Sequence, residues 1–86
     1  MTAPAVVMYT TNWCPYCERA RKVFAAKNVA FEEIDVGLAA EKRAEMHKRS
    51  GRRSVPQIFI GDHHVGGSDD LLALEAAGKL DGLLGR

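Results

Sequence analysis

The sequence contains no run of apolar residues near the roughly twenty that a membrane-spanning helix needs. Its opening lacks a basic segment followed by a long apolar one, so we expect no secretory signal peptide and a cytoplasmic location. There is no low-complexity stretch, linker or internal repeat. The formal net charge is only +1, which argues against a general binder of polyanions, so neither nucleic acid nor a membrane is expected as a partner. The 86 residues predict one domain over residues 1–86.

Cysteine is also scarce, because Cys14 and Cys17 are the only two and lie three positions apart. A disulfide between them would close a very short ring, worth about 2 kcal/mol before strain is subtracted. A reducing cytoplasm also disfavours a permanent disulfide, so the pair indicates thiols that alternate between joined and free. Two weaker readings are a chance pair of inert cysteines and half of a zinc site. The zinc site would need two more ligands, and neither the adjacent His63 and His64 nor the isolated His47 has the usual spacing.

The order of apolar runs and turn residues predicts the fold class. Strands are expected at 6–9, 31–34, 57–60 and 63–65, helices at 15–27, 39–49 and from 68 to 77, and a last short turn at 80–84. The first βαβ unit requires a parallel pair of strands, and the later hairpin adds antiparallel strands. We therefore expect an α/β fold with a four-stranded mixed sheet flanked by helices, in the order β-α-β-α-β-β-α. A C-x-x-C pair beside a βαβ unit is typical of the thioredoxin-like redox fold.

Two of the expected helices carry specific signals. Ser68 is expected to cap the third helix, with Asp69 and Asp70 in the first turn, where the helix dipole favours negative charge. The second helix has few apolar residues, chiefly Leu38 and Met46, so it should lie on the surface.

The position of the cysteines predicts different roles for them. Pro15 suits the first position of a helix, which places Cys14 at the N-cap, facing unpaired N–H groups and the positive end of the helix dipole. Both features favour a thiolate, and basic neighbours such as Arg19 or Lys22 would strengthen the effect. We therefore expect Cys14 to be the exposed nucleophile. Cys17 lies one turn further in and is expected to stay protonated as the resolving thiol.

Three motifs together resemble the glutaredoxin family: Cys-Pro-Tyr-Cys at 14–17, Ser-Val-Pro at 54–56 and Gly-Gly-Ser-Asp-Asp at 66–70. The chain looks most like the small bacterial dithiol proteins of the glutaredoxin 3 type, from about residue 6 to residue 84. The resemblance implies a glutathione-dependent thiol–disulfide oxidoreductase. Such an enzyme reduces protein–glutathione mixed disulfides through Cys14 alone and protein disulfides through Cys14 and Cys17. It also implies a monomer with glutathione as co-substrate, glutathionylated proteins and protein disulfides as partners, and no required metal or nucleotide.

The resemblance also implies how a glutathione groove is built. It implies a cis bond before Pro56, with the backbone of Val55 pairing with the cysteinyl unit of glutathione. Judged without the resemblance, base rates favour an ordinary trans proline at a strand edge for Pro56. The segment containing Gly67 would hold the γ-glutamyl end. There the N–H groups of Ser68 and Asp69 would bind its α-carboxylate, and the carboxylate of Asp69 its ammonium group.

Other groove positions depart from the family pattern or remain open. Many glutaredoxins place a lysine three residues before the first cysteine, where this chain has Thr11. Arg43, which matches another family position, and Arg53 are the candidates to bind the glycine carboxylate of glutathione. Tyr16 is expected to line the groove. Trp13 would shield the sulfur, form a wall for a protein substrate, or simply pack against its neighbours.

Two alternative functions remain. One is a hydrogen donor reduced by thioredoxin reductase, against which the proline of Cys-Pro-Tyr-Cys and the full 66–70 segment both argue. The other is a dimeric carrier of a [2Fe–2S] cluster, held by Cys14 of each chain and two glutathiones. Cluster-binding relatives usually have a smaller motif such as Cys-Gly-Phe-Ser, which disfavours this reading.

Overall fold

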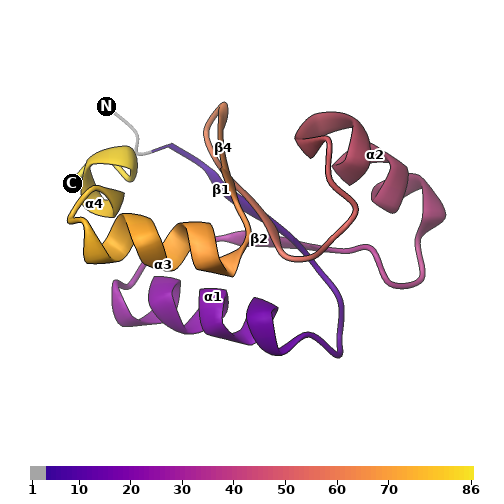
Figure 1. Ribbon diagram of the computed structural model, residues 1–86, viewed down its shortest axis with the longest axis horizontal. Coiled ribbons are helices and arrows are strands. Elements are labelled where there is room, and N and C mark those ends of the chain that lie inside the picture. The colour runs from indigo at the N-terminus through magenta and orange to yellow at the C-terminus, as the bar shows by residue number, and fades with distance from the viewer. Residues whose placement is uncertain (1–3) are drawn as a thin grey trace.

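The computed structural model describes residues 4–86, arranged as a sheet with helices on both faces (Figure 1). The opening residues 1–3, on which the expectation about a signal peptide partly depends, lie outside the described residues. The elements in chain order are β1 (Val6–Thr10), α1 (Pro15–Ala26), β2 (Glu32–Asp35), α2 (Ala40–Ser50), β3 (Gln57–Ile60), β4 (His63–Gly66), α3 (Ser68–Ala76) and α4 (Leu80–Leu83). Within residues 4–86, no helix is both long and apolar enough to span a bilayer.

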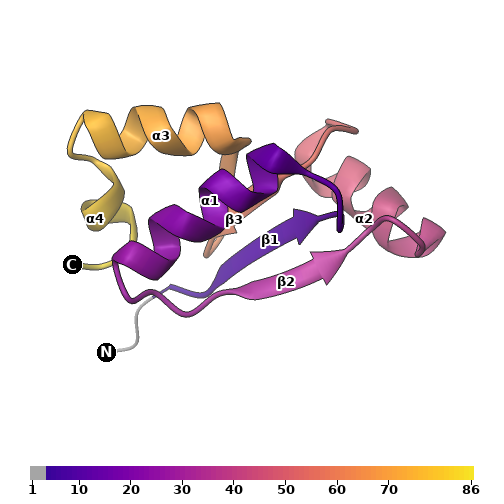
Figure 2. The same ribbon diagram turned by 90° about the horizontal axis from the view of Figure 1, so that it is seen from below.

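The four strands form one mixed sheet in the order β2-β1-β3-β4. β1 and β2 run parallel, as Figure 2 shows, while β1–β3 and β3–β4 are antiparallel pairs. Tyr9 of β1 therefore lies opposite Ile34 on one side and Gln57 on the other. The predicted α/β class and the thioredoxin-like order of elements are confirmed, with the expected last turn present as the short helix α4.

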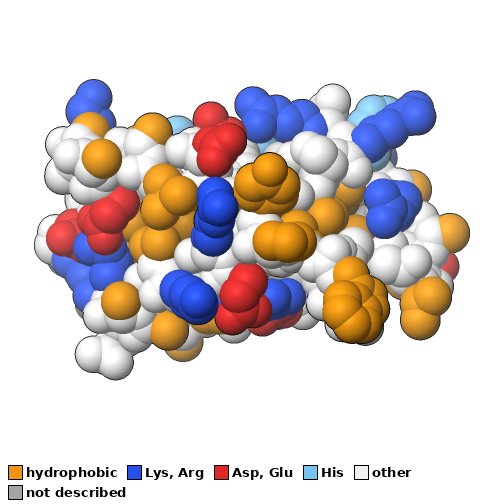
Figure 3. Space-filling view, turned by 60° about the horizontal axis from the view of Figure 1, so that its bottom comes forward, with side chains coloured by type: hydrophobic (Ala, Val, Ile, Leu, Met, Phe, Trp, Pro, Cys, Tyr) orange, Lys and Arg blue, Asp and Glu red, His pale blue; other side chains and the backbone are white. Residues whose placement is uncertain are grey.

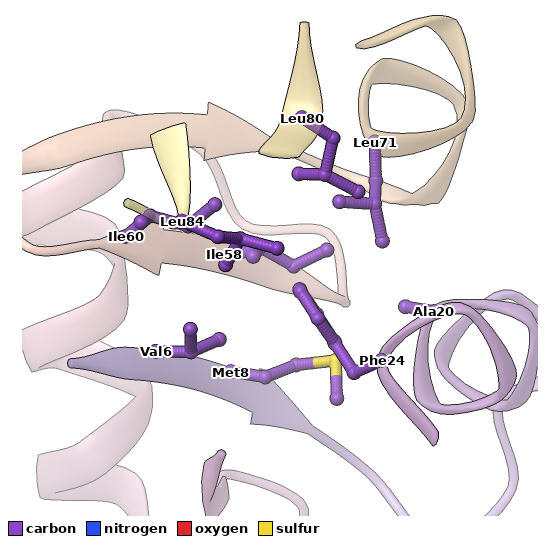
Figure 4. Close-up of a cluster of buried hydrophobic side chains, with 9 residues drawn as sticks. All are labelled: Val6, Met8, Ala20, Phe24, Ile58, Ile60, Leu71, Leu80 and Leu84. Carbon is purple, nitrogen blue, oxygen red and sulfur yellow. The ribbon is translucent and has the colours of Figure 1, made fainter. Parts of the chain in front are cut away.

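The main apolar core lies between one face of the sheet and α1, α3 and α4. Alternate side chains of β1 and β3 point to this face, where they meet α1 and α3 (Figure 4). Its buried residues are Val6, Met8, Ala20, Phe24, Ile58, Ile60, Leu71, Leu80 and Leu84. This layer fixes α1 and α3 side by side, so the first turns of these two helices are held on a common support.

The opposite face of the sheet is covered by α2, which stands apart from α1 and α3 (Figure 1). Met46 is the one fully buried side chain of this helix, as its thin apolar pattern predicted. The expectation that Leu38 belongs to the same apolar face is wrong, because its side chain is 97% exposed. Val36 occupies the interior position instead, since the chain leaves β2 with Val36 turned under the sheet and Leu38 turned outward.

Helices α1 and α2 end at residues that favour the left-handed conformation, whereas the start of α3 differs from the prediction. Asn28 adopts a positive φ of 56° after α1, and Gly51 one of 72° after α2, so both serve as left-handed stops. The prediction that Ser68 caps α3 is wrong, because Gly67 is the N-cap residue and Ser68 is the first helical residue. The capping interaction comes from inside the helix, where the Asp70 carboxylate accepts a hydrogen bond from the Gly67 N–H at 3.0 Å.

Candidate functional site

Cys14 lies at the N-cap of α1, in the extended conformation that precedes a helix. Pro15 follows it at the first helical position, where the absence of an N–H removes no hydrogen bond. The Cys14 sulfur accepts a hydrogen bond from the Cys17 N–H at 3.1 Å. The same sulfur lies 3.7 Å from the carbonyl oxygen of Val55, to which the thiol donates. The half-buried sulfur therefore meets the amino end of a helix on one side and the Val55 turn on the other.

Cys17 is fully buried one turn into α1, and both cysteines are free thiols. Burial, together with the interaction with Cys14, raises the pKa of Cys17 to about 12. The two thiols thus differ as the sequence indicated. Cys17 stays protonated near neutral pH, while Cys14 keeps a partly open face.

The turn before β3 contains the cis peptide bond Val55–Pro56. Pro56 is buried and Val55 half-buried, with the Val55 side chain packed against the cluster beneath α2. Among residues 4–86, the Val55 N–H donates to no backbone carbonyl. The turn therefore presents, beside Cys14, a backbone N–H that remains available as a donor.

The first turn of α3 forms the far wall of the site. Gly67 closes the turn from β4, and the first backbone bond of the helix runs from the Leu71 N–H to the Gly67 carbonyl at 3.0 Å. The N–H groups of Ser68 and Asp69 precede that bond and lie at the positive end of the helix. The Gly67 N–H holds the pKa of the Asp70 carboxyl below its ordinary value. Asp70 is thus committed to the helix start, as the sequence suggested.

These parts enclose an open groove of about 250 Å³. It is lined by Tyr16, Arg52, Ser54, Val55, Pro56, Gly67, Ser68, Asp69 and Asp70. Tyr16 is 53% exposed, and the guanidinium of Arg19 lies 5.5 Å from the centre of its ring. Of the residues predicted to bind a ligand, six line this one groove: Tyr16, Val55, Pro56, Gly67, Ser68 and Asp69.

The two arginines predicted from the sequence do not line the groove. Arg43 lies on the exposed surface of α2, and Arg53 is exposed outside the lining. The cation of the groove is Arg52, whose guanidinium pairs with the Asp70 carboxylate at 3.2 Å. Arg52 lies in a basic stretch with Lys48, Arg49 and Arg53, and the sequence contains no signal for which of these side chains turns inward.

A second hollow lies beside the loop that precedes α1. It is lined by Thr11, Asn12, Trp13, Asp35, Gly37 and Leu38. Trp13 is 95% exposed, so it does not pack in the interior and does not belong to the groove lining. Figure 3 shows apolar side chains exposed among charged ones on the face of the molecule over α1.

No role was predicted for Ser54 or Gln57, and both belong to the support of the site. The Gln57 side chain is fully buried and donates to the Ser54 carbonyl at 2.9 Å. A polar residue at the start of an apolar strand was the one signal that pointed to it. Within residues 4–86, no three side chains of the His, Cys, Asp or Glu type gather as a metal site would require.

Comparisons with known proteins agree on one family. The family model named Glutaredoxin matches residues 6–65. A protein of Pseudomonas aeruginosa named Glutaredoxin is 57% identical over 81 residues, which cover 94% of this chain and 96% of the relative. Glutaredoxin 3 of Escherichia coli K12 is 54% identical over 79 residues, covering 92% and 95%. The solved buckwheat glutaredoxin–glutathione complex is 29% identical, with a TM-score of 0.84 over 95% of this chain and 76% of that one.

Proposed function

Since this chain belongs to the glutaredoxin family, we propose that it is a glutathione-dependent thiol–disulfide oxidoreductase with Cys14 as its nucleophile. One observation carries the proposal. The Cys14 sulfur accepts an N–H bond at the start of α1 and lies next to an open groove whose walls offer further backbone donors. A thiolate accepts such bonds better than a thiol does, so the site suits a sulfur nucleophile.

The first route uses Cys14 alone. Its thiolate attacks the glutathione sulfur of a protein–glutathione mixed disulfide, and the protein thiolate leaves and takes up a proton. Glutathione is then disulfide-bonded to Cys14. The thiolate of a second glutathione attacks the glutathione sulfur of that bond, which releases the Cys14 thiolate and forms oxidised glutathione.

The second route also uses Cys17. Cys14 attacks a protein disulfide and forms a mixed disulfide with the substrate. Cys17 then loses its proton and attacks the Cys14 sulfur, so the substrate leaves as a dithiol and Cys14–Cys17 is oxidised. Burial, which raises the pKa of Cys17 to about 12, keeps this thiol from competing with Cys14 for the first attack. Two glutathione molecules then reduce the pair.

The groove would orient glutathione for both routes. The free N–H of Val55 suits the peptide backbone around the cysteinyl unit, as in the addition of a strand to a sheet edge. The N–H groups of Ser68 and Asp69 suit the γ-glutamyl carboxylate, and the Asp69 side chain suits its ammonium group. Arg52 lines the groove, whereas Arg43 and Arg53 do not, so Arg52 is the better candidate to bind the glycine carboxylate of glutathione.

The test is a glutathione-coupled turnover assay on a glutathionylated peptide, run on the wild type, Cys14→Ser and Cys17→Ser. Cys14→Ser should abolish turnover, because no nucleophile remains at the N-cap. Cys17→Ser should keep deglutathionylation and lose much of its activity on a protein disulfide. Equal losses in the two variants on the glutathionylated peptide would contradict the division of labour.

The same assays separate the alternatives. A hydrogen donor for which thioredoxin reductase is the reductant would turn over with that enzyme and not with glutathione. A cluster carrier would show cluster absorbance after anaerobic reconstitution with iron, sulfide and glutathione, and a protein that stays colourless would count against it. We further propose that the protein works as a monomer in the cytoplasm, where the glutathione pool keeps thiols reduced.

A further inference from the structure

A chain of polar contacts runs from the groove into the interior behind it. The side-chain nitrogen of the buried Gln57 donates to the Ser54 carbonyl at 2.9 Å and lies 3.3 Å from the Ser54 hydroxyl. The side-chain oxygen of Gln57 lies 2.8 Å from Nε2 of His64 on β4. Every polar atom of this buried amide therefore has a partner, which removes the cost of burying it.

The contacts determine the direction of each hydrogen bond. A carbonyl oxygen only accepts, so the nitrogen of the Gln57 amide must face Ser54 and its oxygen must face His64. The His64 ring is consequently the tautomer that carries its proton on Nε2 and donates to Gln57. The ring is held in place by stacking on Phe59, with centroids 4.8 Å apart and planes 27° apart. His64 thus locks the orientation of the amide.

The Ser54 carbonyl shares a peptide plane with the Val55 N–H. The bond between Ser54 and Val55 is trans, since Val55–Pro56 is the cis bond of this turn. In a trans peptide the C=O and the N–H point in opposite directions. Because Gln57 holds the Ser54 carbonyl toward the interior, the Val55 N–H must point the opposite way, away from Gln57. Ser54 and Val55 both line the groove.

We propose that Gln57, held by His64, is a positioning residue that turns the Val55 N–H into the groove and so sets the affinity for the glutathionyl group. This inference rests on the proposed function. Gln57 does not line the groove, and it is not among the hydrogen-bond partners of Cys14, so its loss should weaken binding and leave the reactivity of the sulfur unchanged. The expected loss is that of one misaligned backbone hydrogen bond, roughly three- to tenfold in Kd.

The test uses Gln57→Met, which keeps length but removes both amide bonds, and His64→Phe, which keeps a ring against Phe59 but removes the donor. His63→Phe is the matched control, because His63 is exposed on the same strand. Each protein is titrated with S-methylglutathione, an unreactive probe, while the amide resonance of Val55 is followed by NMR. We expect a three- to tenfold higher Kd and a smaller Val55 shift for Gln57→Met, about a twofold higher Kd for His64→Phe, and no change for His63→Phe.

Kinetics distinguish positioning from general damage. For Gln57→Met, KM for a glutathionylated peptide should rise by the same factor, while kcat and the rate of Cys14 alkylation by iodoacetamide stay within about twofold. An unchanged Kd in both Gln57→Met and His64→Phe would overturn the inference. Losses in kcat and in the alkylation rate of Gln57→Met as large as its rise in Kd would overturn it as well. If Gln57→Met fails to fold, His64→Phe against His63→Phe decides. A wild type that neither binds S-methylglutathione nor turns over would instead refute the proposed function itself.

Discussion

Gly66 ends β4 just before α3 begins, and replacing it with alanine should distort the groove wall that the first turn of α3 forms. Its φ is +113°, a conformation that residues with a side chain rarely adopt. A Cβ at this position would overlap the Asp70 carboxylate and lie 3.1 Å from the Arg52 guanidinium. The carboxylate can swing away, but it then gives up the hydrogen bond from the Gly67 N–H that caps α3.

The cost of Gly66→Ala can be assembled from these two effects. A non-glycine residue held at such a φ costs on the order of 1–3 kcal/mol. Losing the cap at the start of α3 costs about 1 kcal/mol more. The Arg52–Asp70 pair is half exposed and adds little. The free energy of unfolding should fall by roughly 2–4 kcal/mol, which lowers the melting temperature by roughly 10–20 °C in a chain of this size.

Alanine substitutions at two other glycines, measured by urea and thermal unfolding, separate the cost of backbone strain from the cost of losing the helix cap. Gly78 has a φ of +71° with nothing within 4 Å of a new Cβ, so Gly78→Ala reports backbone strain alone, about 1–2 kcal/mol. Gly82 is helical and also open, so Gly82→Ala should be neutral or slightly stabilising. Gly66→Ala should also raise KM for a glutathionylated peptide, because Asp70 no longer orders the first turn of α3. If Gly66→Ala were no more destabilising than Gly78→Ala, the capping role of Asp70 would be refuted.

Three further predictions follow from single contacts. At pH 7–8 iodoacetamide should modify Cys14 and leave Cys17 unmodified by mass spectrometry, because burial raises the pKa of Cys17 to about 12; early labelling of Cys17 would contradict this. Tyr9→Phe should lower the free energy of unfolding by about 1–2 kcal/mol, because the buried Tyr9 hydroxyl donates to the Glu45 carboxylate of α2 at 2.5 Å. Tyr16 is exposed, so Tyr16→Phe should leave the free energy of unfolding unchanged. The pKa of Asp70 is lowered in the folded protein, so the ionised carboxylate stabilises the fold above the ordinary carboxyl pKa, and this stabilisation is lost as pH falls through the folded pKa. The difference in unfolding free energy between wild type and Asp70→Asn, measured by urea unfolding, should therefore vanish at low pH. A difference that grew toward low pH would contradict this direction of the pKa shift.

Much of the fold was predictable because its signals are local. Pro15 at the first helical position indicated that Cys14 is the N-cap residue, and the structure places it there. Asn28 and the Gly61–Asp62 pair are residue types that favour chain reversals, and the structure has a reversal at each of them. Each of these signals depends on the conformational preference of one or two residues, so it can be interpreted without knowledge of the rest of the chain.

The start of α3 shows where local preference misleads. Ser68 has the side chain usually preferred at an N-cap, yet Gly67 occupies that position. The positive φ of Gly66 turns the chain one residue earlier than a serine cap would require. Asp70 then supplies from within the helix the hydrogen bond that a capping side chain would otherwise make. The position of the N-cap is therefore set by the junction with β4, which is a tertiary feature of the fold.

The cation of the groove was not predictable for a related reason. Arg52 and Arg53 are neighbours in an irregular segment after α2, where neither a helical nor a strand period tells which side chain turns inward. Arg52 is selected by Asp70, eighteen positions later in the chain, which becomes its neighbour when α3 packs beside the 52–56 turn. Arg43 lies on a helix that covers the other face of the sheet, so it does not line the groove.

Gln57 is the one polar residue of β3, a strand whose four residues are all buried. A buried amide is tolerated only when its donors and acceptor are all satisfied, and here the partners come from the turn before β3 and from the neighbouring strand β4. An apolar residue of the same size would fill this space but would not hold the Ser54 carbonyl. The identity of residue 57 is therefore best explained by what it does to the Val55 peptide, and stability alone would not require an amide at this position.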